Sequence, residues 1–171
     1  MSEQLTATGR WAEDTPIGEV RDLGSYEVTE REIVDFASRW DPQFFHTDPQ
    51  RATSEGAFGG LIASGIHTMA IYQRLEITSR TQEWHVIGGT GIKDLVLRRP
   101  VRPGDVLTGT SEIVDRRLEP ERRRGLLTFA GQLVNQSGEL VLSLQVSAYV
   151  HMRPLATPAD PTHPTTDQEK A

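Results

Sequence analysis

An aspartate and a histidine, five residues apart in a segment interrupted by proline, carry the strongest chemical signal in the sequence. These residues are Asp41 and His46, and the aromatic residues Trp40, Phe44 and Phe45 flank them. Aromatic walls exclude water, and an acid–base pair in such a pocket can have pKa values shifted toward neutrality. We therefore interpret Asp41 and His46 as a candidate general acid–base pair, and the three aromatic residues as candidate substrate contacts.

The same spacing also suits structural roles. Asp41 precedes Pro42 and could serve only to form a turn. His46 could be a partly buried loop histidine whose ring is hydrogen-bonded to the backbone. Because imidazole and carboxylate groups both bind metals, Asp41, His46 and Asp48 could also form a metal site, although this is the weakest interpretation. Spacing alone leaves these alternatives open.

The pair lies in a break between two expected helical segments. Thr29 and Glu32 have the spacing of a capping box, which predicts a helix over Glu30–Arg39. The apolar residues at helical spacing are Ile33, Phe36, Ala37 and Trp40. Asp41-Pro42 ends this helix, and Asp48-Pro49 begins a short second turn, with the aspartate as its cap. The sequence therefore places the candidate pair in a loop between helices.

The remaining elements suggest a sheet around one buried helix. A longer, apolar helix is expected from about Ser64 to Ile77. Strands are expected at Tyr26–Val28, Val86–Ile92, Asp94–Leu97, Val106–Val114, Gly125–Asn135 and Glu139–His151. A single central helix followed by long alternating strands predicts an α+β fold, in which an antiparallel sheet wraps around that helix.

Composition bounds the domain organisation and the protein class. The chain has 171 residues, which suits one domain with tails. We expect a loose segment over residues 1–12, one domain over 13–152, and a disordered, proline-rich tail over 153–171. No signal-like segment and no apolar run of membrane-spanning length is evident, so we expect a cytoplasmic protein.

Charge and cysteine content exclude several kinds of site. The net charge of −6 argues against general nucleic-acid binding, which needs a positive surface. The absence of cysteine excludes disulfides, thiol nucleophiles and thiolate metal sites. Among the 18 basic residues only Lys93 and Lys170 are lysines, and arginine suits phosphate recognition, so a local phosphate site remains possible on this acidic chain.

Three motifs, in a fitting order, resemble those of the MaoC-like dehydratase family. The first is Asp41-Pro42-Gln43-Phe44-Phe45-His46, which resembles the Asp-x-Asn-Pro-x-His loop of the (R)-specific enoyl-CoA hydratases in that family. The second is Gly60-Leu61-Ile62-Ala63-Ser64-Gly65-Ile66, similar to a Gly-x-Ile-(Ala/Val)-His-Gly-Met segment that enters the central helix. The third is Pro100-Val101-Arg102-Pro103-Gly104-Asp105, similar to a Pro-Val-x-x-Gly-Asp turn. The resemblance covers roughly Gly18 to Val150.

Three positions depart from the family pattern. Gln43 stands where the family usually has Asn, Phe44 where it has Pro, and Ser64 where it often has His. The positions that match are Asp41, His46 and Gly65. The departures concern the shape of the loop and the fit of the substrate more than the chemistry.

The resemblance implies a fold, a reaction and a set of site residues. It implies a hot-dog fold and hydration of a trans-2-enoyl-thioester to the (R)-3-hydroxyacyl-thioester, or the reverse dehydration, with no cofactor and no metal. Asp41 and His46 would hold a water at the β-carbon, with His46 as the base and Asp41 as the donor to the α-carbon. The backbone N–H of Gly65 would bind the thioester oxygen, and Ile62 and Ser64 would contact the substrate.

The resemblance also implies partners. The substrate would be an acyl-CoA thioester, with an acyl-carrier protein as a possible alternative carrier. A hot-dog sheet leaves an exposed edge, so we expect a homodimer or a higher homo-oligomer, and we expect no nucleic-acid or membrane partner.

Two other functions remain open on the sequence. A hot-dog acyl-CoA thioesterase is one, because the same fold hosts thioester hydrolysis. Many such enzymes use a carboxylate in or beside the central helix, and here that helix carries only Glu76, at its far end. A non-catalytic acyl-CoA-binding subunit is the other.

Overall fold

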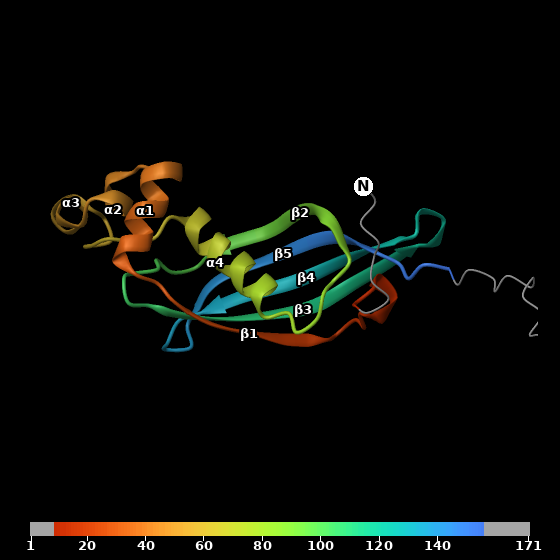
Figure 1. Ribbon diagram of the computed structural model, residues 1–171. Coiled ribbons are helices and arrows are strands. Elements are labelled where there is room, and N and C mark those ends of the chain that lie inside the picture. Colours follow the sequence, from red (N-terminus) through yellow and green to blue (C-terminus); the bar gives the residue numbers. More distant parts are fainter. Residues whose placement is uncertain (1–8, 156–171) are drawn as a thin grey trace, which may run out of the picture.

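One antiparallel sheet and one long helix dominate the fold. The computed structural model describes residues 9–155, and its five-stranded sheet has the strand order β1-β3-β4-β5-β2 (Figure 1). The strands are β1 (Val20–Glu27), β2 (Val86–Leu97), β3 (Val106–Glu119), β4 (Arg124–Val134) and β5 (Leu140–His151). The helices are α1 (Glu30–Trp40), α2 (Phe44–Thr47), α3 (Pro49–Glu55) and α4 (Gly65–Thr78), with short 3₁₀ turns at Ala12–Asp14 and Pro120–Arg122. The predicted α+β architecture is confirmed.

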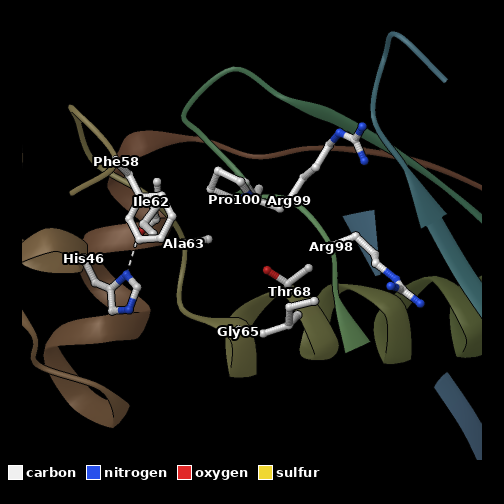
Figure 2. Close-up of a pocket in the computed structure, with 11 residues that line it drawn as sticks. His46, Phe58, Ile62, Ala63, Gly65, Thr68, Arg98, Arg99 and Pro100 are labelled. Carbon is white, nitrogen blue, oxygen red and sulfur yellow. Dashed lines mark hydrogen bonds between the residues drawn. The ribbon is translucent and has the colours of Figure 1, made fainter. Parts of the chain in front are cut away.

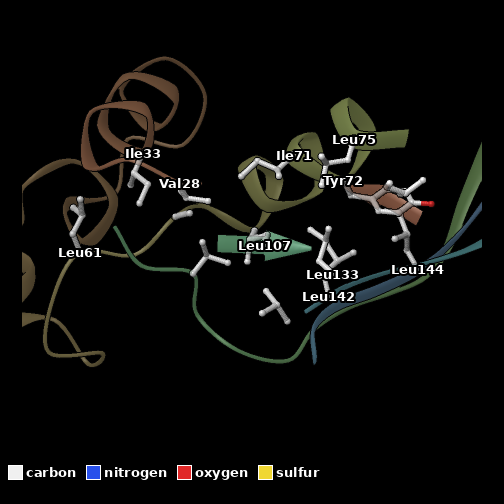
Figure 3. Packing of buried hydrophobic residues seen from close by; sticks show 14 of the residues in the cluster. Val28, Ile33, Leu61, Ile71, Tyr72, Leu75, Leu107, Leu133, Leu142 and Leu144 are labelled. Carbon is white, nitrogen blue, oxygen red and sulfur yellow. The ribbon is translucent and has the colours of Figure 1, made fainter. Parts of the chain in front are cut away.

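Helix α4 packs on the face of the sheet formed by β1, β3 and β4. Its residues Ile71, Tyr72 and Leu75 join the main core, with Leu107 and Leu133 among their partners from the sheet (Figure 3). A Cβ atom at position 131 would overlap the ring of Tyr72, so Gly131 allows this large side chain to lie close against β4. The helix is therefore fixed along its length, which holds its first residue in a defined place.

The strands are fewer than the sequence pattern indicates, and the first three are longer. Of the expected strand at Tyr26–Val28, Tyr26 and Glu27 belong to β1, which begins at Val20 and pairs with β3. The two expected segments after Trp84 form the single strand β2, whose pairing with β5 shifts register between Lys93 and Val96. Within that shift Asp94 has a φ of 51°. A bulge of this kind interrupts the alternation of side chains without ending the strand.

The expected capping signals before α1 and α3 are present. The Thr29 hydroxyl accepts a hydrogen bond from the amide of Glu32 (3.3 Å), and the Glu32 carboxylate accepts one from the amide of Thr29 (3.2 Å). Asp48 accepts a bond from the amide of Arg51 (3.0 Å) and so caps α3. The short helix α2 lies between them, where the sequence predicts only a loop.

The described terminal residues differ from the expected loose ends. Trp11 and Ala12 are fully buried, and Trp11 stacks on His85 with ring centroids 3.7 Å apart. The expectation of a loose segment is thus wrong for residues 11 and 12, because the Trp11 side chain stacks on His85 and is buried there. Arg153 binds the carboxylate of Asp14 (2.8 Å), while residues 1–8 and 156–171 lie outside the described residues. Within residues 9–155 no helix is long and apolar enough to cross a membrane.

Candidate active site

His46 is fixed by a backbone carbonyl that determines which ring nitrogen is free. Its Nδ1 lies 2.7 Å from the carbonyl oxygen of Ile62, and the amide of Ile62 donates in turn to the carbonyl of Phe45 (3.1 Å). A carbonyl only accepts, so Nδ1 carries the proton and the neutral ring presents a lone pair at Nε2. The backbone bond that was one structural alternative therefore exists, and it leaves Nε2 available for chemistry.

Asp41 ends α1 and faces the free nitrogen of His46. Its Oδ2 lies 3.4 Å from His46 Nε2, and the two side chains are 21% and 6% exposed respectively. The Ser64 hydroxyl donates to Oδ2 (2.7 Å), and the Gln43 amide donates to Oδ1 (2.9 Å). These two hydrogen bonds, with a smaller contribution from His46, outweigh partial burial and lower the pKa of Asp41. The carboxylate is therefore ionised at neutral pH.

Gly65 is the first residue of α4. The Ser64 hydroxyl caps the helix by accepting from the amide of Ile66 (3.2 Å). The amide of Gly65 has no acceptor among residues 9–155, as expected for the first turn of a helix. A Cβ atom here would overlap the end of the Leu97 side chain. Gly65 thus combines an unpaired amide with a close helix–strand contact.

A cavity of about 230 Å³ brings several of these groups together (Figure 2). Its lining includes three predicted site residues, His46, Ile62 and Gly65. The other lining residues are Phe58, Ala63, Thr68, Leu97, Arg98, Arg99, Pro100 and Val101. Asp41 and Ser64 do not line it, but Asp41 faces His46 Nε2 at 3.4 Å and accepts a hydrogen bond from the Ser64 hydroxyl. His46 and Gly65 therefore border one small cavity, and Asp41 lies next to His46.

The structure does not bring the three predicted aromatic contacts to this cavity. Trp40 is 71% exposed at the end of α1. Phe44 lies under the guanidinium of Arg51 (4.3 Å to the ring centroid), and Phe45 packs against the main core. Phe58 supplies the aromatic side chain of the wall instead. Phe58 lies in the turn between Gly56 and Gly59, outside any periodic pattern, so no sequence signal singled it out.

The metal interpretation is not supported by the described part of the chain. Residues 9–155 contain no group of three or more histidine, aspartate or glutamate side chains placed to hold a metal ion. Asp48, the third proposed ligand, has its carboxylate committed to the cap of α3. Of the three proposed ligands, only Asp41 and His46 face each other.

Comparisons with known proteins identify the family. Residues 13–128 match the model of the MaoC-like domain. The protein YdeM of Bacillus subtilis is 35% identical over 135 residues, which cover 78% of this chain and 94% of that protein. The structure of a MaoC-like dehydratase from Rhodospirillum rubrum is similar with a TM-score of 0.75 and 34% identity, over 86% of this chain and 100% of that one.

A more distant structure confirms the fold alone. The unliganded R-hydratase PhaJ1 from Pseudomonas aeruginosa has a TM-score of 0.67 and 22% identity, over 88% of this chain and 94% of that chain. Together with the sheet and central helix described above, these neighbours confirm the expected hot-dog fold. The chain belongs to the MaoC-like domain family.

Proposed function

We propose that this protein adds water to a trans-2-enoyl-thioester to give the (R)-3-hydroxyacyl-thioester, and catalyses the reverse dehydration. One observation carries the proposal: Asp41 Oδ2 lies 3.4 Å from His46 Nε2, and His46 lines a cavity together with Gly65, whose amide is unpaired. The name of the Rhodospirillum rubrum relative, a MaoC-like dehydratase, supports the same reaction class.

The pair is suited to hold one water. An ionised Asp41 and a His46 protonated only at Nδ1 both present acceptors, so a water between them donates one hydrogen to each. Its oxygen lone pairs then point away from the pair, toward the cavity. A β-carbon placed there is attacked by this oxygen while the double-bond electrons move toward the thioester oxygen.

Gly65 is suited to stabilise the charge that develops. As the thioester becomes an enolate, negative charge collects on its oxygen, and the amide at the start of α4 donates to it from the positive end of the helix. Preorganised donors of this kind contribute about 2.7–4 kcal/mol in comparable oxyanion sites. Because the amide has no acceptor in the described residues, it pays no cost of breaking an internal bond.

The roles of the two side chains differ from those expected from the resemblance. An Asp41 with a lowered pKa does not start as a proton donor. We assign His46 Nε2 as the group that takes a proton from water and returns it to the α-carbon. Asp41 orients the water and stabilises the imidazolium that forms between these two transfers. One proton leaves the water and one reaches carbon, so the enzyme returns to its starting state.

A homodimer fits the exposed apolar surface. Strand β2 is at the edge of the sheet, and an unpaired edge with apolar side chains favours pairing. The large hydrophobic residues exposed on β2 and α4 are Ile66, Ile77, Val86, Ile87, Ile92, Leu95 and Leu97. We propose that a second copy covers this surface, which borders the cavity through Leu97.

The thioesterase alternative has less support from the structure. Glu76, the only carboxylate on the central helix, is buried at its far end and forms ion pairs with Arg21 and Arg80. It is separated by about three helical turns from Gly65, or roughly 16 Å along the axis. A carboxylate so placed and so paired cannot reach a thioester bound at the cavity.

A direct assay separates the candidate functions. Purified protein is mixed with crotonyl-CoA, and loss of the conjugated thioester absorbance is followed, with the stereochemistry of the product determined by chiral analysis. We expect (R)-3-hydroxybutyryl-CoA. Release of free thiol from butyryl-CoA indicates a thioesterase instead, and binding of either ester without turnover indicates a non-catalytic subunit.

A further inference from the structure

The end of β2 and the segment after it place arginines on one wall of the cavity. Arg98 and Arg99 line it, and Arg102 lies close by, with its guanidinium bonded to the carbonyl of Phe58 (2.7 Å). Arg99 forms an ion pair with Glu139 (3.1 Å). The Arg98 side chain has no hydrogen-bond or ion-pair partner among residues 9–155. It is therefore a free cation at the border of the candidate active site.

The nearby carboxylates are already engaged. Glu139 accepts hydrogen bonds from Asn135 (3.0 Å) besides its pairing with Arg99. Asp105 accepts from the amide of Arg102 (2.7 Å) and from the side chain of Gln136 (3.0 Å). Neither is placed to neutralise Arg98. A chain with a net charge of −6 thus keeps an uncompensated positive group at this cavity.

The order of the groups in the cavity gives the direction of the substrate. In Figure 2, His46 and Arg98 lie on opposite sides of Gly65, and the Arg98 guanidinium points away from His46. In an enoyl-thioester the β-carbon, the carbonyl and the sulfur follow one another in line. If the β-carbon lies at His46 and the carbonyl oxygen at the Gly65 amide, the sulfur and the carrier extend toward Arg98. The acyl tail extends the other way.

We infer that Arg98 binds a phosphate group of the carrier arm to which the acyl group is esterified. This rests on the proposed function, because the direction of the substrate follows from the chemistry assigned to His46 and Gly65. The planar fork of arginine forms two parallel hydrogen bonds with a phosphate, which a lysine cannot reproduce. Both coenzyme A and the prosthetic arm of a carrier protein present such a phosphate.

The test measures binding rather than turnover. Butyryl-CoA is saturated and cannot be hydrated, so its dissociation constant is measured by titration calorimetry with the wild-type protein and with Arg98→Gln. We expect roughly tenfold weaker binding, as for loss of one charge-assisted hydrogen-bonded contact, and partial recovery in Arg98→Lys. Arg31→Gln is the matched control for net charge, because Arg31 is 90% exposed on α1 and its substitution should leave the constant unchanged.

Two further ligands identify the anion. Butyryl-pantetheine has no phosphate, so it should bind equally to the wild type and to Arg98→Gln. Equal binding of butyryl-CoA to both proteins overturns the inference. Weaker binding of succinyl-pantetheine, but not of butyryl-pantetheine, to the variant also overturns it, because the anion recognised is then a carboxylate of the acyl group.

The source of the phosphate follows from a last comparison. Butyryl-loaded carrier protein is titrated in parallel with butyryl-CoA. The ester whose binding is weakened more by Arg98→Gln is the one whose phosphate Arg98 binds. A loss with either ester supports the inference. If Arg98 governs binding of these esters but no enoyl-thioester is hydrated, the phosphate site stands and the proposed reaction fails.

Discussion

Ser64 uses one hydroxyl for two tasks, and substitution can separate them. The hydroxyl caps α4 through the amide of Ile66 and donates to Asp41 Oδ2 at 2.7 Å. Alanine removes both interactions, whereas glycine is nearly as good a cap as serine, with a loss of only a few tenths of a kcal/mol. Ser64→Gly therefore removes the bond to Asp41 and nearly preserves the helix start, and Ser64→Ala removes both.

The magnitude follows from the bond to Asp41. A hydrogen bond to a charged group contributes about 1.5–3 kcal/mol, and 1.36 kcal/mol corresponds to one pKa unit. Because the Asp41 side chain is partly exposed, we take the lower end of this energy range. Losing the hydrogen bond then raises the pKa of Asp41 by about one pH unit in either variant. The bond that is lost favours the ionised carboxyl, whose pKa in the wild type lies below the ordinary 3.8, so its removal moves the titration of Asp41 upward.

The assay is a carbon-13 NMR titration of the Asp41 carboxyl, which follows this group directly, with thermal unfolding of each variant as a companion measurement. We expect the Asp41 midpoint of both variants to move up by about one pH unit. Only Ser64→Ala should lose about 1 kcal/mol of stability from the cap at neutral pH. Asp41 midpoints that coincide with that of the wild type in both variants would refute the link between Ser64 and Asp41.

Three other predictions test the site, the core and the edge. His46→Ala should lower hydration at least about a hundredfold with circular dichroism unchanged, since a general acid–base group is lost; an unchanged rate removes its assigned role. Gly131→Ala should lower the free energy of unfolding by about 1–3 kcal/mol in urea, because its Cβ overlaps the Tyr72 ring. Pairing with Tyr72→Leu should restore part of that loss. Ile92→Arg on β2 should give a monomer near 19.0 kDa by light scattering, while the wild type is larger.

The sequence correctly predicted the elements that depend on interactions between residues close together in the chain. The Thr29–Glu32 capping box and the Asp48 cap each start a helix where the sequence indicates, because these hydrogen bonds join residues three apart. The first residue of α4, Gly65, is one position from the expected start. Alternating side chains predicted the strands of the second half, but not the bulge that joins both parts of β2.

The contacts that complete the site join distant residues, and single-residue patterns carry little information about them. Asp41 receives its hydrogen bond from Ser64, 23 positions away, and His46 receives its orientation from the Ile62 carbonyl, 16 positions away. Trp40 appeared to belong to the site because it is adjacent to Asp41. A helix turns each neighbour by about 100°, and Trp40 points to solvent.

The two described ends of the chain lie on the side opposite to the loop that carries Asp41 and His46. Residues 9 and 10 run beside Trp84, and Met152 is bonded to Arg123 at the hairpin between β3 and β4, whereas α1, α2 and α3 cover the other end of the sheet (Figure 1). A fluorescent protein or a surface linker joined directly at residue 9 or residue 155 would thus be held away from the cavity. Such shortened and fused forms should therefore retain access of bulky thioesters to His46.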